Sequence, residues 1–237
     1  MRKILLVSLL LSSTIINAYA QTARYANRST SNFNIGEFKY GFKAGSSHFR
    51  YDNEEGNKYS DGSMHFNNRF HGGIFGEYAV TDTYGLYGEV LYIGKGTKIS
   101  LKDGADVKNN KGIKNLIFNL DYLGFSVGLS SYPGEDKNFF WLAGLYMSYI
   151  LSAKADINIE IGGEKIHEKV NLKETSPNLQ KLDVGFTGGG GYEFDMGLIL
   201  GLTGDIGLIR VFKNVKGINL GLNCSMGYNL AKLYKAS

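Results

Sequence analysis

The chain alternates apolar and polar residues with a period of two, and this pattern leaves few folds open to it. Between Gly217 and Leu230 every second side chain is apolar, and the side chains between them are small or polar. Successive side chains of a β-strand point to opposite faces. The segment therefore predicts a strand with one apolar face and one polar face.

Seven further segments alternate in the same way, some less regularly: residues 38–45, 70–80, 84–97, 116–132, 139–153, 182–194 and 198–208. The sequence predicts no amphipathic helix between them. Closure of such strands into a barrel leaves none of them with an unpaired edge. We therefore predict an all-β protein, an eight-stranded antiparallel up-and-down β-barrel.

The predicted connections differ in length. Residues 81–83, 133–138 and 195–197 form short turns, whereas residues 51–65, 98–115 and 154–181 form long loops. All the short turns therefore lie at one end of the barrel. Outer-membrane barrels have this arrangement, with short turns on the periplasmic side and long loops outside.

The first twenty residues resemble a secretory signal, because Arg2 and Lys3 precede an apolar stretch that ends in small residues. We predict cleavage between Ala20 and Gln21. The expected organisation is a cleaved signal peptide at 1–20, a polar periplasmic lead-in at 21–35, an outer-membrane β-barrel at 36–230 and a C-terminal tail at 231–237.

Alternation alone does not say which face meets lipid, since a soluble carrier barrel buries its apolar side chains and a membrane barrel exposes them. The polar phase is rich in glycine, of which the chain has 32, and glycine suits the crowded interior of a narrow barrel. Aromatic residues gather near the short turns, as in an interfacial girdle: Phe38, Tyr78, Tyr84, Phe139, Trp141, Tyr192 and Phe194. We therefore expect a transmembrane barrel, with a soluble exported barrel that binds a small apolar ligand as an alternative.

The face turned away from lipid carries ionisable residues of both signs: Lys39, Lys43, His71, Glu77, Glu89, Lys95, Asp183, Glu193 and Asp205. An eight-stranded barrel is only wide enough inside for its own side chains. Mixed charges in so narrow a space favour an ion-paired, hydrogen-bonded plug over a conducting pore. We expect these residues to form a polar network in the barrel interior.

Several kinds of site are not predicted. The net charge of +4 includes two basic residues of the expected signal, and the other basic residues are scattered, so no nucleic-acid partner is expected. The four histidines and single cysteine lack metal-ligand spacing, and the glycine run at 188–191 is not followed by a helix or a Lys-Ser/Thr pair. We expect no metal and no cofactor.

Ser46 and His48 share a face near the outer end of the first predicted strand. A serine hydrolase needs a third group that orients the histidine. The sequence gives no such partner at a defined distance. We therefore expect no catalytic residues and no enzyme activity.

The loop at 154–181 is charged, but its first part still alternates through Ile157, Ile159 and Ile161. This pattern predicts that the strands continue beyond the membrane as a hairpin. A protruding strand edge can pair with a strand of another chain. The loop is therefore a possible binding site for an envelope protein partner.

Four segments resemble successive strands of the PorT-like outer-membrane β-barrel family, a "porin family" of small barrels common in Bacteroidetes. They are residues 84–96, 120–125, 140–154 and 183–193. The resemblance implies an eight-stranded barrel in the outer membrane of a Gram-negative bacterium, surrounded by outer-membrane lipid and inserted by the outer-membrane barrel assembly machinery. We expect a structural or interaction role, and the alternative that the resemblance implies is a component of a protein-secretion apparatus.

Overall fold

The computed structural model describes residues 35–52, 62–101, 111–161, 164–213 and 217–235. The predicted signal peptide, its cleavage position between Ala20 and Gln21, and residues 21–34 of the lead-in lie outside these ranges. The strands are β1 (Phe38–Asp52), β2 (Gly62–Ala79), β3 (Tyr84–Leu101), β4 (Lys111–Ser131), β5 (Phe139–Ile161), β6 (Glu164–Asn171), β7 (Leu182–Glu193), β8 (Leu198–Arg210) and β9 (Ile218–Asn229). The helices are α3 (Leu172–Thr175) and α4 (Ala231–Lys235).

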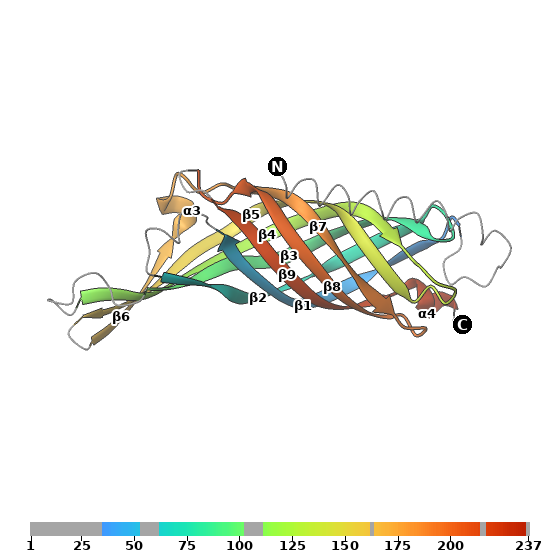
Figure 1. Cartoon of the computed structure of the whole chain (residues 1–237), viewed down its shortest axis with the longest axis horizontal. Coiled ribbons are helices and arrows are strands. Elements are labelled where there is room, and N and C mark those ends of the chain that lie inside the picture. The colour runs from blue at the N-terminus through green and yellow to red at the C-terminus, as the bar shows by residue number, and fades with distance from the viewer. Residues whose placement is uncertain (1–34, 53–61, 102–110, 162–163, 214–216, 236–237) are drawn as a thin grey trace.

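Eight of the strands close into a barrel, as the alternation predicts. Each pairs antiparallel with its neighbours in the order β1, β2, β3, β4, β5, β7, β8 and β9. The pairing of β1 with β9 closes the barrel. Strand β6 is outside it, because among the described strands β6 pairs only with the outer part of β5. The β6 hairpin and helix α4 lie at opposite ends of the molecule (Figure 1).

The strands extend further on the long-loop side than predicted. Strand β2 begins at Gly62, whereas the sequence places its start at residue 70. Strand β5 runs on to Ile161 and pairs with β6, so the predicted loop at 154–181 begins as the expected hairpin. The predicted loops at 51–65 and 98–115 are likewise partly strand.

The short turns close the other end of the barrel. In the turn that joins β4 to β5, Lys137 Nζ donates to Thr83 Oγ1 at 3.1 Å. Burial lowers the pKa of the Lys137 ammonium, and the negative charge of Asp82 opposes this shift. The neighbouring turns are thus tied to each other by side chains.

The apolar phase of the strands faces outward. Phe42, Ile74 and Leu129 are 53%, 62% and 63% exposed, whereas Lys39 and Lys95 are only 2% and 1% exposed. The soluble-carrier alternative is not supported, because a carrier would bury its apolar phase. The exposed apolar surface and the polar interior are those of a barrel in lipid.

Glycines make room inside the barrel for aromatic rings. A Cβ added at Gly221 would lie 2.2 Å from Cε1 of Phe49, and one added at Gly185 would lie 2.6 Å from Cε1 of Tyr146. In each case the ring covers the glycine of another strand, a packing known to offset the weakness of glycine in sheets. Part of the glycine excess in the sequence therefore provides space for inward-pointing rings.

An apolar cluster fills the outer end of the barrel. Its buried members are Phe49, Tyr51, Ile93, Leu120, Tyr122, Ile150, Ala153, Leu179 and Val211. The connection after α3 folds over this end, where Leu179 bridges to Phe212 and Gln180 N donates to Val211 O at 2.9 Å. Apolar side chains thus cap the lumen on the long-loop side.

Neither helix within the described ranges has the length and hydropathy needed to cross a membrane. Helix α4 occupies the predicted C-terminal tail. Ala231 N donates to the Asn229 side chain at 3.1 Å, and Lys232 Nζ donates to Phe194 O at 3.3 Å. These bonds hold the helix against the short-turn end.

Candidate functional site: the barrel interior

The interior polar residues form layers along the barrel axis, and the first layer lies near the short turns. Lys39 Nζ is 2.8 Å from Glu193 Oε2 and lies over the Tyr132 ring, 4.3 Å from its centroid. Glu193 also accepts from Asn229 Nδ2 at 2.9 Å. Glu77 accepts from the hydroxyls of Ser130 and Tyr132, the latter at 2.6 Å. These bonds connect β7 with β1 and β9, and β2 with the end of β4, across the lumen.

The second layer is centred on Lys43 and Glu89, which form an ion pair. The Tyr87 hydroxyl donates to Glu89 at 2.5 Å. On the other side of Lys43, Ser47 Oγ and His71 Nδ1 lie 2.9 Å apart, and both residues are fully buried. The layer combines charged and neutral hydrogen bonds, while the other ring nitrogen of His71, Nε2, is buried without a hydrogen-bond partner among the described residues.

The third layer holds Lys95, whose Nζ is 2.7 Å from Asp183 Oδ2. Asp183 accepts a further bond from Asn219 Nδ2 at 2.9 Å and lies 3.3 Å from the Tyr146 hydroxyl. The Lys95 ammonium is also 4.2 Å from the centroid of the Tyr146 ring. Such a cation over an aromatic face is stabilised electrostatically when both are desolvated.

The nine residues that the sequence places in the interior all lie there, in contact with one another or with other inward side chains. Asp205 completes the set, accepting from Asn223 Nδ2 at 2.9 Å. Arg69, outside the predicted set, pairs with Asp121 and donates to Asn119 at 3.1 Å. This cluster is separate from the interior network, because Asn119 and Asp121 alternate along β4 with the buried Leu120 and Tyr122.

The predicted interior set contains only ionisable residues and omits the neutral side chains that bond to them. Tyrosine hydroxyls and asparagine amides supply many of the bonds to the interior carboxylates: Tyr87, Tyr132, Tyr146, Asn219, Asn223 and Asn229. The polar phase of β9 contains three of these asparagines. Their regular inward spacing is the sequence signal that could have identified them.

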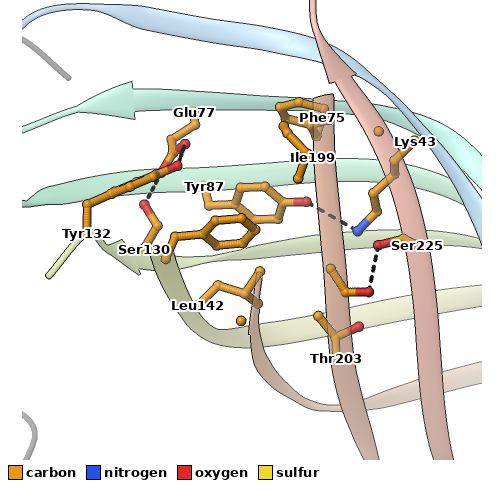
Figure 2. A pocket seen from close by; sticks show the side chains of 14 residues that line it. Lys43, Phe75, Glu77, Tyr87, Ser130, Tyr132, Leu142, Ile199, Thr203 and Ser225 are labelled. Carbon is orange, nitrogen blue, oxygen red and sulfur yellow. Dashed lines mark hydrogen bonds between the residues drawn. The ribbon is translucent and has the colours of Figure 1, made fainter. Parts of the chain in front are cut away.

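Little space remains between these side chains. The lumen keeps a cavity of about 40 Å³ beside Lys43, Glu77 and Tyr87, and one of about 20 Å³ beside His71 and Asp205. Figure 2 shows the Lys43 ammonium directed at the Tyr87 hydroxyl and Ser130 directed at Glu77 across the first cavity. Since one water needs about 10 to 15 Å³ of such volume, each cavity has room for only a few waters.

The chemistry available to the interior is therefore limited. Within the described residues, no three His, Cys, Asp or Glu side chains gather in a group that could hold a metal ion. The carboxylates are engaged by lysines, hydroxyls and amides of the barrel itself. The arrangement can hold the wall together and obstruct the lumen.

The comparisons with known proteins agree with the fold. Residues 19–213 match the model of a family described as outer membrane protein beta-barrel domain. None of the curated protein sequences matches the chain.

Solved structures that are similar to this chain include three at low identity. Ail, the attachment invasion locus protein of Yersinia pestis, has 8% identity and a TM-score of 0.42, and the match covers 82% of this chain and 98% of that chain. Neisserial surface protein A has 14% identity and a TM-score of 0.43, and the match covers 81% of this chain and 97% of that chain. OprG from Pseudomonas aeruginosa has 11% identity and a TM-score of 0.41, and the match covers 83% of this chain and 98% of that chain. The family match, which spans most of the chain, shows that this protein belongs to the outer membrane protein beta-barrel domain family and is located in the outer membrane of a Gram-negative bacterium.

Proposed function

We propose that the protein is an integral outer-membrane barrel with a plugged polar interior and outward loops, and that its role is structural or interactive. The observation that carries the proposal is the filled lumen. Layers of ion pairs occupy the barrel, and the apolar cluster around Phe49 and Leu179 closes its outer end. A barrel filled in this way offers its surroundings only its surface and its loops.

Electrical recording tests the plug. The purified barrel, inserted into a planar lipid bilayer, is expected to give no steady ionic current, because cavities of about 40 and 20 Å³ do not form a continuous water column. A large porin in the same bilayer is the positive control, since wide barrels conduct. A steady ohmic current that scales with the amount of inserted protein would contradict the proposal.

The interactive part of the role is assigned to the hairpin of β5 and β6. Strand β6 is at the edge of the sheet, and its partner on the other side is β5 alone. Ile166 is 45% exposed on this strand. An edge strand can add a strand from another protein, while its charges, here Glu168 and Lys169, limit indiscriminate pairing. An envelope protein is the partner that we propose for this edge.

Site-specific cross-linking in cells tests this assignment. A photoreactive residue in place of Glu168 is expected to give one discrete cross-linked product, because strand addition fixes a single register. The control replaces Met226, which is 58% exposed on the lipid-facing surface. The assignment fails if the two positions give the same products, or if Glu168 gives none.

Two finer points rest on the sequence resemblance. The PorT-like group is proposed as the part of the family nearest to this chain, because its strand sequences resemble residues 84–96 and 183–193. Insertion by the outer-membrane barrel assembly machinery is proposed for the same reason. Depleting that machinery should leave the barrel unfolded, as judged by the loss of its heat-modifiable band on a gel.

A further inference from the structure

Three polar side chains meet on the outer surface of the barrel, on the face opposite to the interior network. Ser46 and His48 point outward from β1, and Asn68 points outward from β2 directly opposite His48. Ser46 Oγ lies 3.2 Å from His48 Nε2, and His48 Nδ1 lies 2.7 Å from Asn68 Oδ1. The structure thus supplies the third partner that the sequence does not define.

The order of these contacts is that of a nucleophile, a base and an orienting group. The oxygen of Asn68 accepts the Nδ1 proton of His48, which leaves Nε2 as the acceptor for the Ser46 hydroxyl. The same order of contacts activates serine in hydrolases with unrelated folds, where it is recognised by geometry. A single Ser–His contact would not fix the tautomer in this way.

The backbone next to Asn68 is irregular. The pairing of β2 with β3 shifts register between Phe66 and His71, while the pairing of β2 with β1 stays regular through this stretch. A β-bulge of this kind changes the direction of nearby side chains, and bulges are frequent beside active sites. The irregularity therefore falls at the residue that orients His48.

The three residues lie at the depth of lipid ester groups. From Phe38 at the short-turn end, the outward side chains of β1 are apolar up to Ala44 and then become Ser46, His48 and Arg50. A tilted strand climbs about 2.5 Å per residue, so His48 is about 25 Å above Phe38, which is the height of the apolar band of such barrels. The ester carbonyls of lipids lie at that boundary between the acyl chains and the headgroups.

The surroundings suit a phosphate-bearing lipid. A shallow groove on the lipid-facing surface begins at Ser46 and crosses β9, β8 and β7; its lining includes Ala44, Cys224, Met226 and Leu202. One outward step beyond His48, the Arg50 guanidinium lies over the Phe66 ring, 5.4 Å from its centroid. The groove fits an acyl chain below the serine, and the cation fits a phosphate above it.

We infer that Ser46, His48 and Asn68 form a lipid acyl-ester hydrolase site on the outside of the barrel. Ser46 Oγ attacks the ester carbonyl carbon and its proton passes to His48 Nε2. The carbon–oxygen bond of the ester then breaks, and the leaving alkoxide takes the proton from His48. Water attacks the acyl-serine, gives a proton to His48, and releases the fatty acid as that proton returns to Ser46. Asn68 is a positioning residue, since it acts through His48.

Fatty-acid release from vesicles tests the site. The folded barrel is reconstituted in vesicles that contain either glycerophospholipid or lipid A with labelled acyl chains, and the two arms identify the source of the ester. Release in either arm is expected, together with labelling of Ser46 by a fluorophosphonate that mass spectrometry locates. Ser46→Ala should lower release by about 100-fold or more and abolish the labelling. Absence of wild-type release in both arms overturns the inference.

Two further variants separate catalysis from structure. Asn68→Ala should lower kcat by about 100-fold at an unchanged KM, and Asn68→Asp should restore it, because a carboxylate also accepts the Nδ1 proton. Leu129→Ala is the control that should leave acyl release unchanged, since Leu129 is 63% exposed on the outer surface and does not line the groove. Full activity of Ser46→Ala, or fluorophosphonate labelling that mass spectrometry locates at a residue other than Ser46, overturns the inference. The heat-modifiable band on a gel verifies that every variant is folded, so the result is independent of the proposed interactive role.

Discussion

Removal of the Lys95 charge tests whether the interior ion pairs stabilise the barrel. The side chains of Lys95 and Asp183 are 1% and 5% exposed, and their charged atoms are 2.7 Å apart. Lys95→Met keeps most of the side-chain volume and its contact with the Tyr146 ring. It leaves the Asp183 carboxylate buried without its cation.

The expected loss follows from what Asp183 keeps. Breaking a buried pair by removing one partner costs about 3 to 5 kcal/mol. Asp183 would still accept from Asn219 Nδ2 at 2.9 Å and remain near the Tyr146 hydroxyl, which places the loss at about 3 kcal/mol, the lower end of that range. The double variant Lys95→Met with Asp183→Leu should recover most of it, because no charge is then left unpaired.

Urea unfolding in lipid vesicles measures these losses. The chain has one tryptophan, Trp141, which is 59% exposed toward lipid, so its fluorescence reports the transfer from lipid to water. Lys232→Met is the control: Lys232 Nζ is 3.5 Å from Glu193 and its side chain is 19% exposed, so its loss should be below about 1 kcal/mol. A Lys95→Met barrel as stable as the wild type would refute the reasoning, and so would a double variant less stable than the single one.

Three further changes test the packing, the membrane depth and the hairpin. Gly221→Ala should cost about 1 to 3 kcal/mol, because its Cβ would lie 2.2 Å from the buried Phe49 ring, whereas Gly88→Ala has 3.7 Å of space and should be tolerated; the same urea unfolding compares the two. Ile74→Lys should cost about 2 to 4 kcal/mol near the bilayer midplane and Asn68→Lys about 1 kcal/mol or less at the interface, and equal costs would contradict the assigned depth. Replacing residues 157–170 by a short glycine-rich turn should leave the urea midpoint nearly unchanged while removing the Glu168 cross-link, because the removed segment pairs only with itself and with the outer end of β4 at residues 111–116; a clearly lowered midpoint would show that the hairpin supports the barrel.

The faces of the strands could be predicted because parity alone determines them. Once Phe42 is assigned to lipid, Lys43 must face the lumen, whatever strand lies beside it. The same parity identifies Glu193 and Asp205 from the sequence without knowledge of their partners. Parity fails only where a strand contains an irregularity, as β2 does between Phe66 and His71.

The partners could not be predicted because they depend on register and on closure. Lys39 and Glu193 are 154 residues apart, and they meet only because β1 and β7 lie on the same narrow lumen. The cap formed by Leu179 and Val211 follows from a connection that folds back across the barrel, and its sequence does not alternate. Asn68 is a third example, since its place opposite His48 depends on the β1 to β2 register.

One short part of β1 contributes to both the interior plug and the proposed hydrolase site on the outside. Because its side chains alternate between the two faces, the two roles can be tested separately. Ser47 points inward and contacts His71 at 2.9 Å, whereas Ser46 and His48 point outward to Asn68. Ser47→Ala leaves a buried imidazole nitrogen without its partner, and it should therefore lower stability while the outer site keeps its geometry. Ser46→Ala removes an exposed hydroxyl, so it should leave stability unchanged and stop acyl release. A strand whose two faces respond independently in this way can hold a plug together on one side and act on lipid on the other.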